Sequence, residues 1–432
     1  MRRAKKFLFK VHSWIGIQMG ILFFIVCLSG TLATLSHEMD YLFNPAIRAD
    51  PMDRLAPRNL ILDNFKKAYP NGKIDLWQRA NEPYLCDLIY KVENGARNYV
   101  FANPYTGAIQ GEAQITFARF FRDLHYYLFI PSQIGHFIVL FFGFQLLISL
   151  GTALAFYKKW WRKLFELQTD KGILVFFRSG HRLIGLWTVP FTILFSLTGI
   201  WYFLERTDTA NISTTSNPKR PKIQLTTEEM EVRSYTFDSM KIDYDLALQK
   251  AEQAIPGMRA GDISPPKTYR DVIYITGFGK VPLVRARANR VYVDPMTYEV
   301  LAVQDAQHLG TVMYLNDIAD PMHFGYWGGL TTKFIWFILG LGISSLVFSG
   351  LYITAKRKAI KRKKKNQNPL GPWWFINWGL IGIVLFYMFH NLVNRYNVST
   401  STIVGLAMGL IFLLFMAWYL FFHKLRGHTN QG

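Results

Sequence analysis

Cysteine and charged residues are scarce in this chain of 432 residues. The two cysteines are Cys27, inside an apolar run, and Cys86, in a polar segment, so we expect no disulfide framework and no zinc or iron–sulfur site built on cysteine. Charged residues make up 18% of the chain, against about 25% in an average soluble domain, while half of the residues are hydrophobic. A single soluble enzyme, a disordered chain and a collagen-like chain are therefore disfavoured.

Several nucleotide-binding and catalytic motifs are also absent. No G-x-G-x-x-G follows a strand-like run, no phosphate-binding loop occurs, and no flavin or nicotinamide domain can be placed. The sequence contains no H-E-x-x-H, no clear pairing of a nucleophile with a base, and no paired carboxylates inside its apolar runs. A protease and a proton-coupled pump are disfavoured, and any redox chemistry has to receive its electrons from outside the chain.

Long apolar runs dominate the sequence instead. A helix needs roughly 20 apolar residues to cross a hydrocarbon core of about 30 Å. Six windows meet this length, at about 14–36, 136–157, 183–204, 333–355, 374–394 and 403–422. The first run is too long for a signal peptide, and no small-residue cleavage site ends it, so we expect it to be retained. The sequence predicts six transmembrane helices.

The net charge of +20 is concentrated beside these apolar runs. Basic residues cluster within the first ten residues and in the segments 158–163 and 356–365, and the tail carries Lys424 and Arg426. The positive-inside rule places all four groups, and with them both termini, in the cytoplasm. The polar stretches 38–124 and 206–322 then fall outside the membrane together. We interpret the lysine run as an anchor near anionic lipid in the bilayer and expect no nucleic-acid partner.

The first four apolar runs form a tandem duplication. The matching pairs are His12–Gly30 with His181–Gly199, both 18 positions apart, and His125–Lys158 with His323–Lys356, both 33 positions apart. Each polar stretch has a helical-looking piece followed by strand-like alternation, and each contains an Asn/Asp-Pro-x-Thr turn, at Asn103 and Asp294. Both halves run in the same direction, so we expect an axis along the membrane normal to relate them.

These patterns predict an all-α polytopic membrane protein with six transmembrane helices, four of them in a tandem parallel repeat, and two small α+β domains outside the membrane. The expected order is a first span at 1–37, an α+β domain at 38–124, a second span at 125–158, a cytoplasmic loop at 159–180, a third span at 181–205, a second α+β domain at 206–322, a fourth span at 323–356, a basic loop at 357–372, and a pair of spans with a short tail at 373–432.

The motifs resemble the PepSY-associated transmembrane family over about residues 1–360. The resemblance is carried by His-x-Trp/Leu-Ile-Gly in the first and third runs, the two Asn/Asp-Pro-x-Thr turns, Leu-His before the second run and His-Phe-Gly-x-Trp-Gly-Gly before the fourth. That family includes iron-regulated inner-membrane proteins and periplasmic ferric-siderophore reductases that carry b-type haem. The resemblance therefore implies PepSY-like domains in the periplasm of a bacterium. The chain departs from the pattern at Asn103, where Asp is usual, and in residues 366–432, which add two runs.

Four of the ten histidines obey the repeat. An imidazole in or near a bilayer is costly without a partner, and imidazole is a common axial ligand of haem iron. A twofold axis makes His12 face His181 at the cytoplasmic end and His125 face His323 at the outer end. We therefore expect two haem b groups, each with its iron between one pair. His136 is a weaker candidate ligand that could replace His125, at the loss of the symmetry.

Gly16 and Gly185 each lie four residues after a histidine of the inner pair, on the same helix face. A glycine there would let a flat porphyrin lie against the backbone, but helix–helix packing explains it equally well. Nearby cations could neutralise haem propionates, although the membrane topology explains them as well; they are Lys10, Arg178 and Arg182. Other side chains suit an anionic metal chelate, or else a membrane interface or a domain core; they are Trp77, Arg79, Tyr84, Tyr126, Tyr127, Tyr326 and Trp327.

Two haems, one near each leaflet, would provide a path for electrons across the membrane. Together with the resemblance, this predicts a haem-dependent reductase of a periplasmic ferric siderophore, supplied with electrons by a quinol or a cytoplasmic reductase. The alternative is a non-redox, membrane-anchored module whose PepSY-like domains bind peptides and regulate proteases, with histidines that are only structural. A transporter is less favoured, because the repeats are parallel and no run is clearly interrupted at the midplane.

Overall fold

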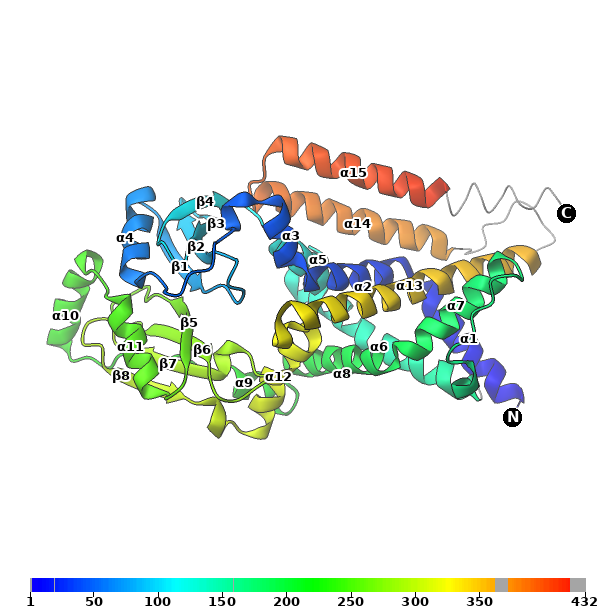
Figure 1. Ribbon diagram of the computed structural model, residues 1–432, viewed down its shortest axis with the longest axis horizontal. Helices are drawn as coiled ribbons and strands as arrows, with labels where there is room; N and C mark the ends of the chain where they lie inside the picture. Colours follow the sequence, from blue (N-terminus) through cyan, green and yellow to red (C-terminus); the bar gives the residue numbers. More distant parts are fainter. Residues whose placement is uncertain (1, 19, 158, 362–371, 420–432) are drawn as a thin grey trace. The chain divides into compact units, whose positions relative to one another are not determined.

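A computed structural model describes residues 2–18, 20–157, 159–361 and 372–419 (Figure 1). The chain divides into two compact units. The helical unit comprises Met1–Leu35, Arg119–Phe203 and Lys333–Gly432, and the sheet unit comprises Ser36–Ala118 and Leu204–Thr332. Of the basic groups used for the predicted topology, Lys158, residues 362–365, Lys424 and Arg426 lie outside the described residues.

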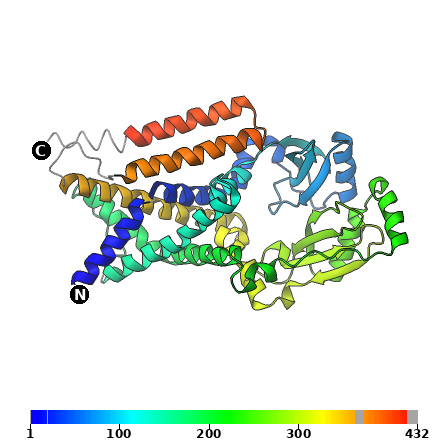
Figure 2. The same cartoon turned by 180° about the vertical axis from the view of Figure 1, so that it is seen from behind.

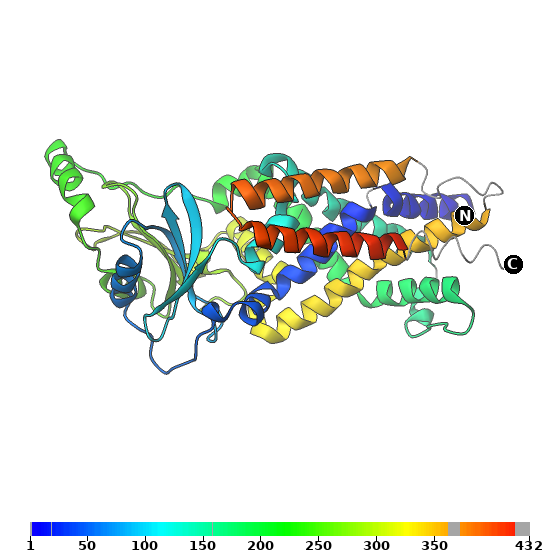
Figure 3. The ribbon, with the colours of Figure 1, turned by 90° about the horizontal axis from the view of Figure 1, so that it is seen from above.

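Long apolar helices build the helical unit. They are α1 (Arg2–Gln18), α2 (Gly20–Thr34), α5 (Phe117–Tyr127), α6 (Ser132–Phe156), α7 (Ile173–Trp187), α8 (Val189–Arg206), α13 (Gly329–Lys361), α14 (Trp373–Asn394) and α15 (Thr400–Trp418). Helix α1 packs along α6 (Figure 2). Helices α14 and α15 lie side by side as a hairpin (Figure 3).

Three described helices are long and apolar enough to cross a membrane, namely Ser132–Phe156, Tyr326–Arg357 and Phe375–Asn394. The number rises to five if each of two bent pairs, α1 with α2 and α7 with α8, forms one span. A shorter apolar helix covers Thr400–Phe412. The part of the chain that the structure describes thus supports a multi-pass protein with three to five spans, where the sequence predicts six.

Both bent pairs break at equivalent positions of the repeat. The helix axes turn by 74° after Gln18 and by 66° after Trp187, in each half six residues beyond the histidine of the inner pair. The breaks lie close to the inner histidines, and nothing places them at the midplane, so the prediction that no run is interrupted at the midplane stays a prediction. In the second half, Thr188 ends α7 and Pro190 follows, whose nitrogen cannot donate a hydrogen bond to the preceding turn.

In the first half, α14 supplies partners for the backbone groups beside the break. Asn377 of α14 is buried, and its amide nitrogen donates to the carbonyl of Gln18 at 3.2 Å. Its Oδ1 accepts from the backbone amide of Ile21 at 3.3 Å. Inside a bilayer no water is present to satisfy such groups, so a broken helix depends on side chains of a neighbouring helix.

The sheet unit contains one antiparallel sheet of eight strands in the order β4-β3-β2-β1-β5-β6-β7-β8. The strands are β1 (Lys73–Gln78), β2 (Asp87–Glu93), β3 (Ala96–Ala102), β4 (Ile109–Ala113), β5 (Arg259–Ser264), β6 (Ile273–Phe278), β7 (Asn289–Val293) and β8 (Val300–Gln304). Each predicted α+β domain contributes four consecutive strands. The two halves join where β1 pairs with β5, with Trp77 opposite Ile263, so the two expected domains share a single sheet.

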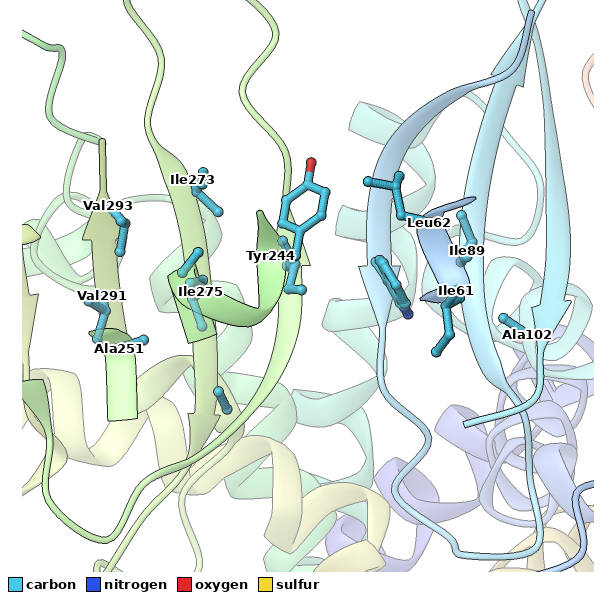
Figure 4. Packing of buried hydrophobic residues seen from close by; sticks show 14 of the residues in the cluster. Ile61, Leu62, Ile89, Ala102, Tyr244, Ala251, Ile273, Ile275, Val291 and Val293 are labelled. Atoms are coloured by element: carbon cyan, nitrogen blue, oxygen red, sulfur yellow. The ribbon is translucent and has the colours of Figure 1, made fainter. Parts of the chain in front are cut away.

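One hydrophobic core serves both halves of this sheet. Helices α4 (Arg58–Ala68) and α11 (Tyr244–Ala254) contribute to the same apolar cluster (Figure 4). The cluster includes Ile61, Leu62, Ile89, Ala102, Tyr244, Ala251, Ile273, Ile275, Val291 and Val293. Trp77 belongs to this core and has no exposed surface. It therefore cannot contact a chelate, and of its two interpretations the domain-core one holds.

Helices α4 and α11 also cap each other at their N-termini. The carboxylate of Asp245 accepts from the backbone amides of Arg58, at 2.6 Å, and Asn59, at 3.0 Å. In return, Oδ1 of Asn59 accepts from the amide of Tyr244 at 2.9 Å. The first amides of a helix have no partner within it. Each half of the sheet unit therefore provides a hydrogen-bond acceptor for the first backbone amides of the other half's helix.

Both predicted Asn/Asp-Pro-x-Thr turns are formed. Oδ1 of Asn103 accepts from the backbone amides two and three residues further on, at 2.9 and 3.1 Å. Oδ1 of Asp294 accepts in the same way, at 2.7 and 3.2 Å. The amide oxygen of Asn103 thus replaces a carboxylate without loss of the turn. Asp294 also forms a two-bond ion pair with Arg233, at 3.0 and 2.7 Å, which Asn103 could not match.

A buried ion pair at the joint of the two halves provides a first prediction. Asp87 is fully buried, pairs with Arg58 and accepts from Trp77 Nε1 at 3.0 Å. Removing one partner leaves a buried charge unpaired, so we expect Asp87→Ala to lower the free energy of unfolding of the sheet by about 3–5 kcal/mol. The control is Asp63→Ala, which removes an exposed pair with Lys241 and should cost about 0–1 kcal/mol. Amide hydrogen exchange of β1 to β3 measures both, and equal effects would contradict the prediction.

The ionisation of Asp262 provides a second prediction. Burial raises the pKa of Asp262 from 3.8 to about 6, although it accepts from the backbone amide of Arg79 at 3.1 Å. The folded protein therefore holds this proton more tightly than the unfolded chain, and folding stability falls as the pH rises from about 4 to 6. We expect a protonated-carboxyl infrared band that is larger at pH 5 than at pH 7.5, and a smaller band at pH 5 in Asp262→Asn, where Asp40 still contributes because burial also raises its pKa to about 6. A band that does not change with pH would contradict this.

Candidate functional site

The structure brings His12 and His181 together inside the helical unit. His12 lies on α1 and His181 on α7, at equivalent positions of the two halves. Their ring centroids are 6.2 Å apart, and the ring planes are inclined by 82°. Two residues that are 169 positions apart in the sequence thus form one imidazole pair, as the twofold arrangement predicts for the inner site.

Each ring of this pair is held by the second span of its own half. His12 Nδ1 lies 3.0 Å from the carbonyl oxygen of Ser149 on α6, and 3.1 Å from the hydroxyl of the same residue. His181 Nδ1 lies 2.8 Å from the hydroxyl of Ser349 on α13. The sequence reasoning did not single out these two serines. The available signal is a hydroxyl within an apolar run, which is also typical of ordinary helix contacts.

These bonds determine which ring nitrogen carries the proton. A carbonyl oxygen can only accept, so Nδ1 of His12 donates to Ser149. The hydroxyl of Ser349 lies 3.3 Å from the carbonyl oxygen of Leu346, so it can donate to that carbonyl while it accepts from Nδ1 of His181. A neutral imidazole that is protonated at Nδ1 has its lone pair on Nε2, the form in which histidine binds metals while its other nitrogen is oriented by a second partner. The bond of His12 to a carbonyl selects this tautomer, and the bond of His181 to a hydroxyl is compatible with it.

The separation of the two rings would allow both to bind the iron of one haem. A metal–imidazole bond of about 2 Å, with the ring nitrogen about 1 Å from the centroid, puts two opposed imidazoles roughly 6 Å apart between centroids. The observed separation is 6.2 Å. Among the described residues no group of three or more His, Cys, Asp or Glu side chains is placed to hold a metal ion. Two imidazoles suit an iron whose remaining ligands come from a macrocycle.

The two glycines expected beside the inner pair are not crowded by neighbouring helices. A Cβ atom on Gly16 would meet no described atom within 4 Å, and one on Gly185 would meet only the side chain of Leu346, at 3.7 Å. Neither glycine is therefore needed for a close helix–helix contact with a described residue. Gly350 of α13, which the sequence reasoning missed, approaches His181 more closely, because a Cβ there would lie 3.3 Å from the ring carbon Cε1.

Arg182 places a cationic donor next to His181 in the chain. Its guanidinium donates to the hydroxyl of Tyr157 at 3.1 Å and to the carbonyl of Glu166 at 3.0 Å. Its Nε is buried and has no hydrogen-bond partner among the described residues. One donor of this guanidinium therefore remains for an anionic group such as a haem propionate, as the sequence suggests for this residue.

Of the two histidines predicted to form the outer site, only His125 belongs to the helical unit. His125 of α5 donates through Nδ1 to the carbonyl of Val26 on α2, at 2.9 Å, which again leaves the lone pair on Nε2. His136 of α6 bonds in the same way to the carbonyl of Ser132 in its own helix, and its ring contacts Tyr126 and Tyr127. His323 lies on α12 (Thr311–Phe324) of the sheet unit. The pairing of His125 with His323 stays a prediction.

Gly30 makes the contact between His125 and α2 possible. A Cβ atom on Gly30 would lie 2.6 Å from Cε1 of His125 and 2.8 Å from its Nδ1, closer than real contacts allow. The glycine therefore opens the surface of α2 so that the imidazole reaches the carbonyl of Val26. Its repeat counterpart Gly199 instead faces Gly143 of α6. The same position of the repeat thus serves a histidine in one half and a helix contact in the other.

This contact leads to a third prediction. We expect Gly30→Ala to displace the His125 ring and to break its bond to Val26, at a cost of about 1–3 kcal/mol for the lost bond. Gly151→Ala on α6 is the control, because a methyl group there meets no described atom within 4 Å and alanine favours a helix by about 0.5–1 kcal/mol. Thermal unfolding in detergent and hydrogen exchange at the His125 ring measure the effect, and equal behaviour of the two variants would refute it.

Comparison with known proteins supports the family suggested by the motifs. The family described as PepSY-associated TM region matches residues 9–357, which include the four repeat histidines and end before α14. "Uncharacterized protein PA4219" of Pseudomonas aeruginosa is 23% identical over 254 residues, which cover 55% of this chain and 63% of that protein. The chain thus spans less than two thirds of this relative. Because the family match covers most of its length, this chain belongs to the PepSY-associated transmembrane family.

Proposed function

We propose that this membrane protein carries electrons across the bilayer through two haem b groups and reduces a ferric siderophore outside it. The observation that carries the proposal is the pair of His12 and His181, with ring centroids 6.2 Å apart and both Nδ1 atoms hydrogen-bonded. Histidines that only hold helices together do not need the close approach of two rings.

The residues of the inner site have separate tasks in this proposal. Haem iron, when bound, supplies the one-electron chemistry, and the protein supplies binding, orientation and electrostatics. His12 and His181 would hold the haem iron through Nε2. Ser149 and Ser349 hold the two rings in orientation and make them more basic through Nδ1. Arg182 offers its free Nε to a propionate.

The outer site, the substrate and the orientation are parts of the same proposal. His125 and His323 hold the second haem, with His136 as a substitute for His125. The protein lies in a bacterial inner membrane, with the sheet unit in the periplasm and both termini in the cytoplasm. Electrons come from a quinol or a cytoplasmic reductase. Reduction to Fe(II) loosens a chelate whose hard oxygen ligands are suited to Fe(III).

The haem content of the purified protein tests the proposal. We expect two b-type haems per chain in mild detergent, and one in His12→Ala and in His181→Ala, because a haem with one axial imidazole is held less firmly. His125→Ala and His323→Ala should lose the other haem. Pyridine haemochrome assays and reduced-minus-oxidised spectra give the stoichiometry. The protein reduced by dithionite should be reoxidised by a ferric siderophore, and more slowly in each variant.

The control is His308→Ala, because the His308 side chain is 82% exposed on the sheet unit and should leave the haem content unchanged. His136→Ala decides between His136 and His125 as the outer ligand. A protein without haem, expressed with an ample haem supply, would overturn the proposal. The membrane-anchored peptide-binding module would then be the better account of the sheet unit.

A further inference from the structure

The turn between α5 and α6 has an unfavourable backbone conformation. Leu128 and Phe129 both have φ of +57°, a left-handed conformation that residues with a Cβ atom adopt at a cost. Both side chains are almost completely buried. The turn lies three residues after His125 and leads into the helix of His136. Strained backbone of this kind persists only where the surrounding structure holds it in place.

Helix α14 and the residues that follow it hold this turn. The side-chain amide of Asn391 donates to the carbonyl of Phe129 at 3.0 Å. The guanidinium of Arg395 donates to the hydroxyl of Tyr127 at 2.9 Å. Two bonds thus reach the turn and its preceding residue from beyond residue 357, where the family match ends.

A buried polar cluster extends the same attachment to α5. The Asp123 carboxylate is 1% exposed, accepts from the hydroxyl of Tyr396 and pairs with Arg119 at 3.1 Å. Arg119 also donates to the hydroxyl of Tyr396 at 2.8 Å. Asp123 precedes His125 by two residues, so the cluster holds the helix that carries this histidine. A buried carboxylate is stable only with such partners.

Helix α14 also packs against the residues that surround this histidine. Val384 lies in one cluster with Val26, whose carbonyl binds His125, and with Leu128 of the turn. Asn377, Val384 and Asn391 repeat every seven residues, which places them along one face of the helix. Helix α14 therefore contacts α2, whose Val26 carbonyl accepts from His125, and also the turn that follows the helix of His125.

The second half of the repeat cannot form these contacts with its own residues. At the positions equivalent to Asp123 and Tyr127 it has Pro321 and Gly325, which have no polar side chain. The attachment is thus specific to the first half, and α14 makes the two halves unequal.

We propose that α14, with Asn391 as its main positioning residue, fixes the His125 imidazole in place. What His125 binds rests on the proposed haem function, but the positioning itself does not. The segment outside the family region then serves one of the two outer histidines, and loss of the Asn391 bond would affect the site of His125 and not the inner pair.

The test uses the full-length protein in detergent and compares Asn391→Ala with Asn394→Ala. Asn394 lies on the same helix and bonds only to His390 among the described residues, so it is the matched control. We expect Asn391→Ala to speed amide exchange of the α5–α6 turn by about five- to a hundredfold, because a buried hydrogen bond is lost. Exchange at the His125 ring should rise as well, while exchange at His181 stays unchanged.

If the turn and His125 exchange at the wild-type rate in Asn391→Ala, the positioning proposal is wrong, whether or not the protein holds haem. If haem is present, the spectrum and midpoint potential of the outer haem should change in Asn391→Ala and not in Asn394→Ala. Faster exchange in a protein without haem would uphold the positioning and refute the haem function. A general loss of folding would appear as faster exchange at His181 too, and would contradict a local role.

Discussion

An imidazole inside a membrane protein has two nitrogens to satisfy, and this constraint organises the helical unit. His12, His125 and His181 each use Nδ1 to bond an acceptor on a different helix. The bond joins two helices, orients the ring and keeps the proton on Nδ1. A neutral ring with its proton on Nδ1 has its lone pair on Nε2. Helix packing and the tautomer of the ring are in this way consequences of the same hydrogen bond.

The same need for satisfied polar groups explains the irregular parts of the unit. Both halves break a helix six residues after the inner histidine, and the break frees backbone groups that no water can reach. One half has Pro190 shortly after its break, and the other depends on Asn377 from α14. In the sheet unit, Asp245 and Asn59 play a comparable part, since each caps a helix from the other half.

The repeat can be recognised in the sequence because the spacings between its histidines, glycines and lysines are equal in the two halves, although most other residues differ. It predicts the meeting of His12 with His181 and the two turns at Asn103 and Asp294, all of which the structure contains. It does not predict that β1 and β5 join two domains into one sheet, because backbone hydrogen bonding at a strand edge does not depend on which strand is the partner. It also missed the breaks, since one of them is stabilised by an asparagine more than 350 residues away.

The sequence by itself determined the membrane class, the duplicated plan and the identity of the histidines, because hydropathy, spacing and residue type are local properties of the chain. Only the tertiary structure decided which atoms these histidines bond, and hence which tautomer they adopt. It alone showed Gly30 to be an opening for His125 and Gly199 a helix contact, although the two glycines are equivalent in the repeat. The physical reason is that a glycine or a serine in an apolar run has the same sequence signature whatever it faces, and its role is fixed by the neighbour that packing brings to it.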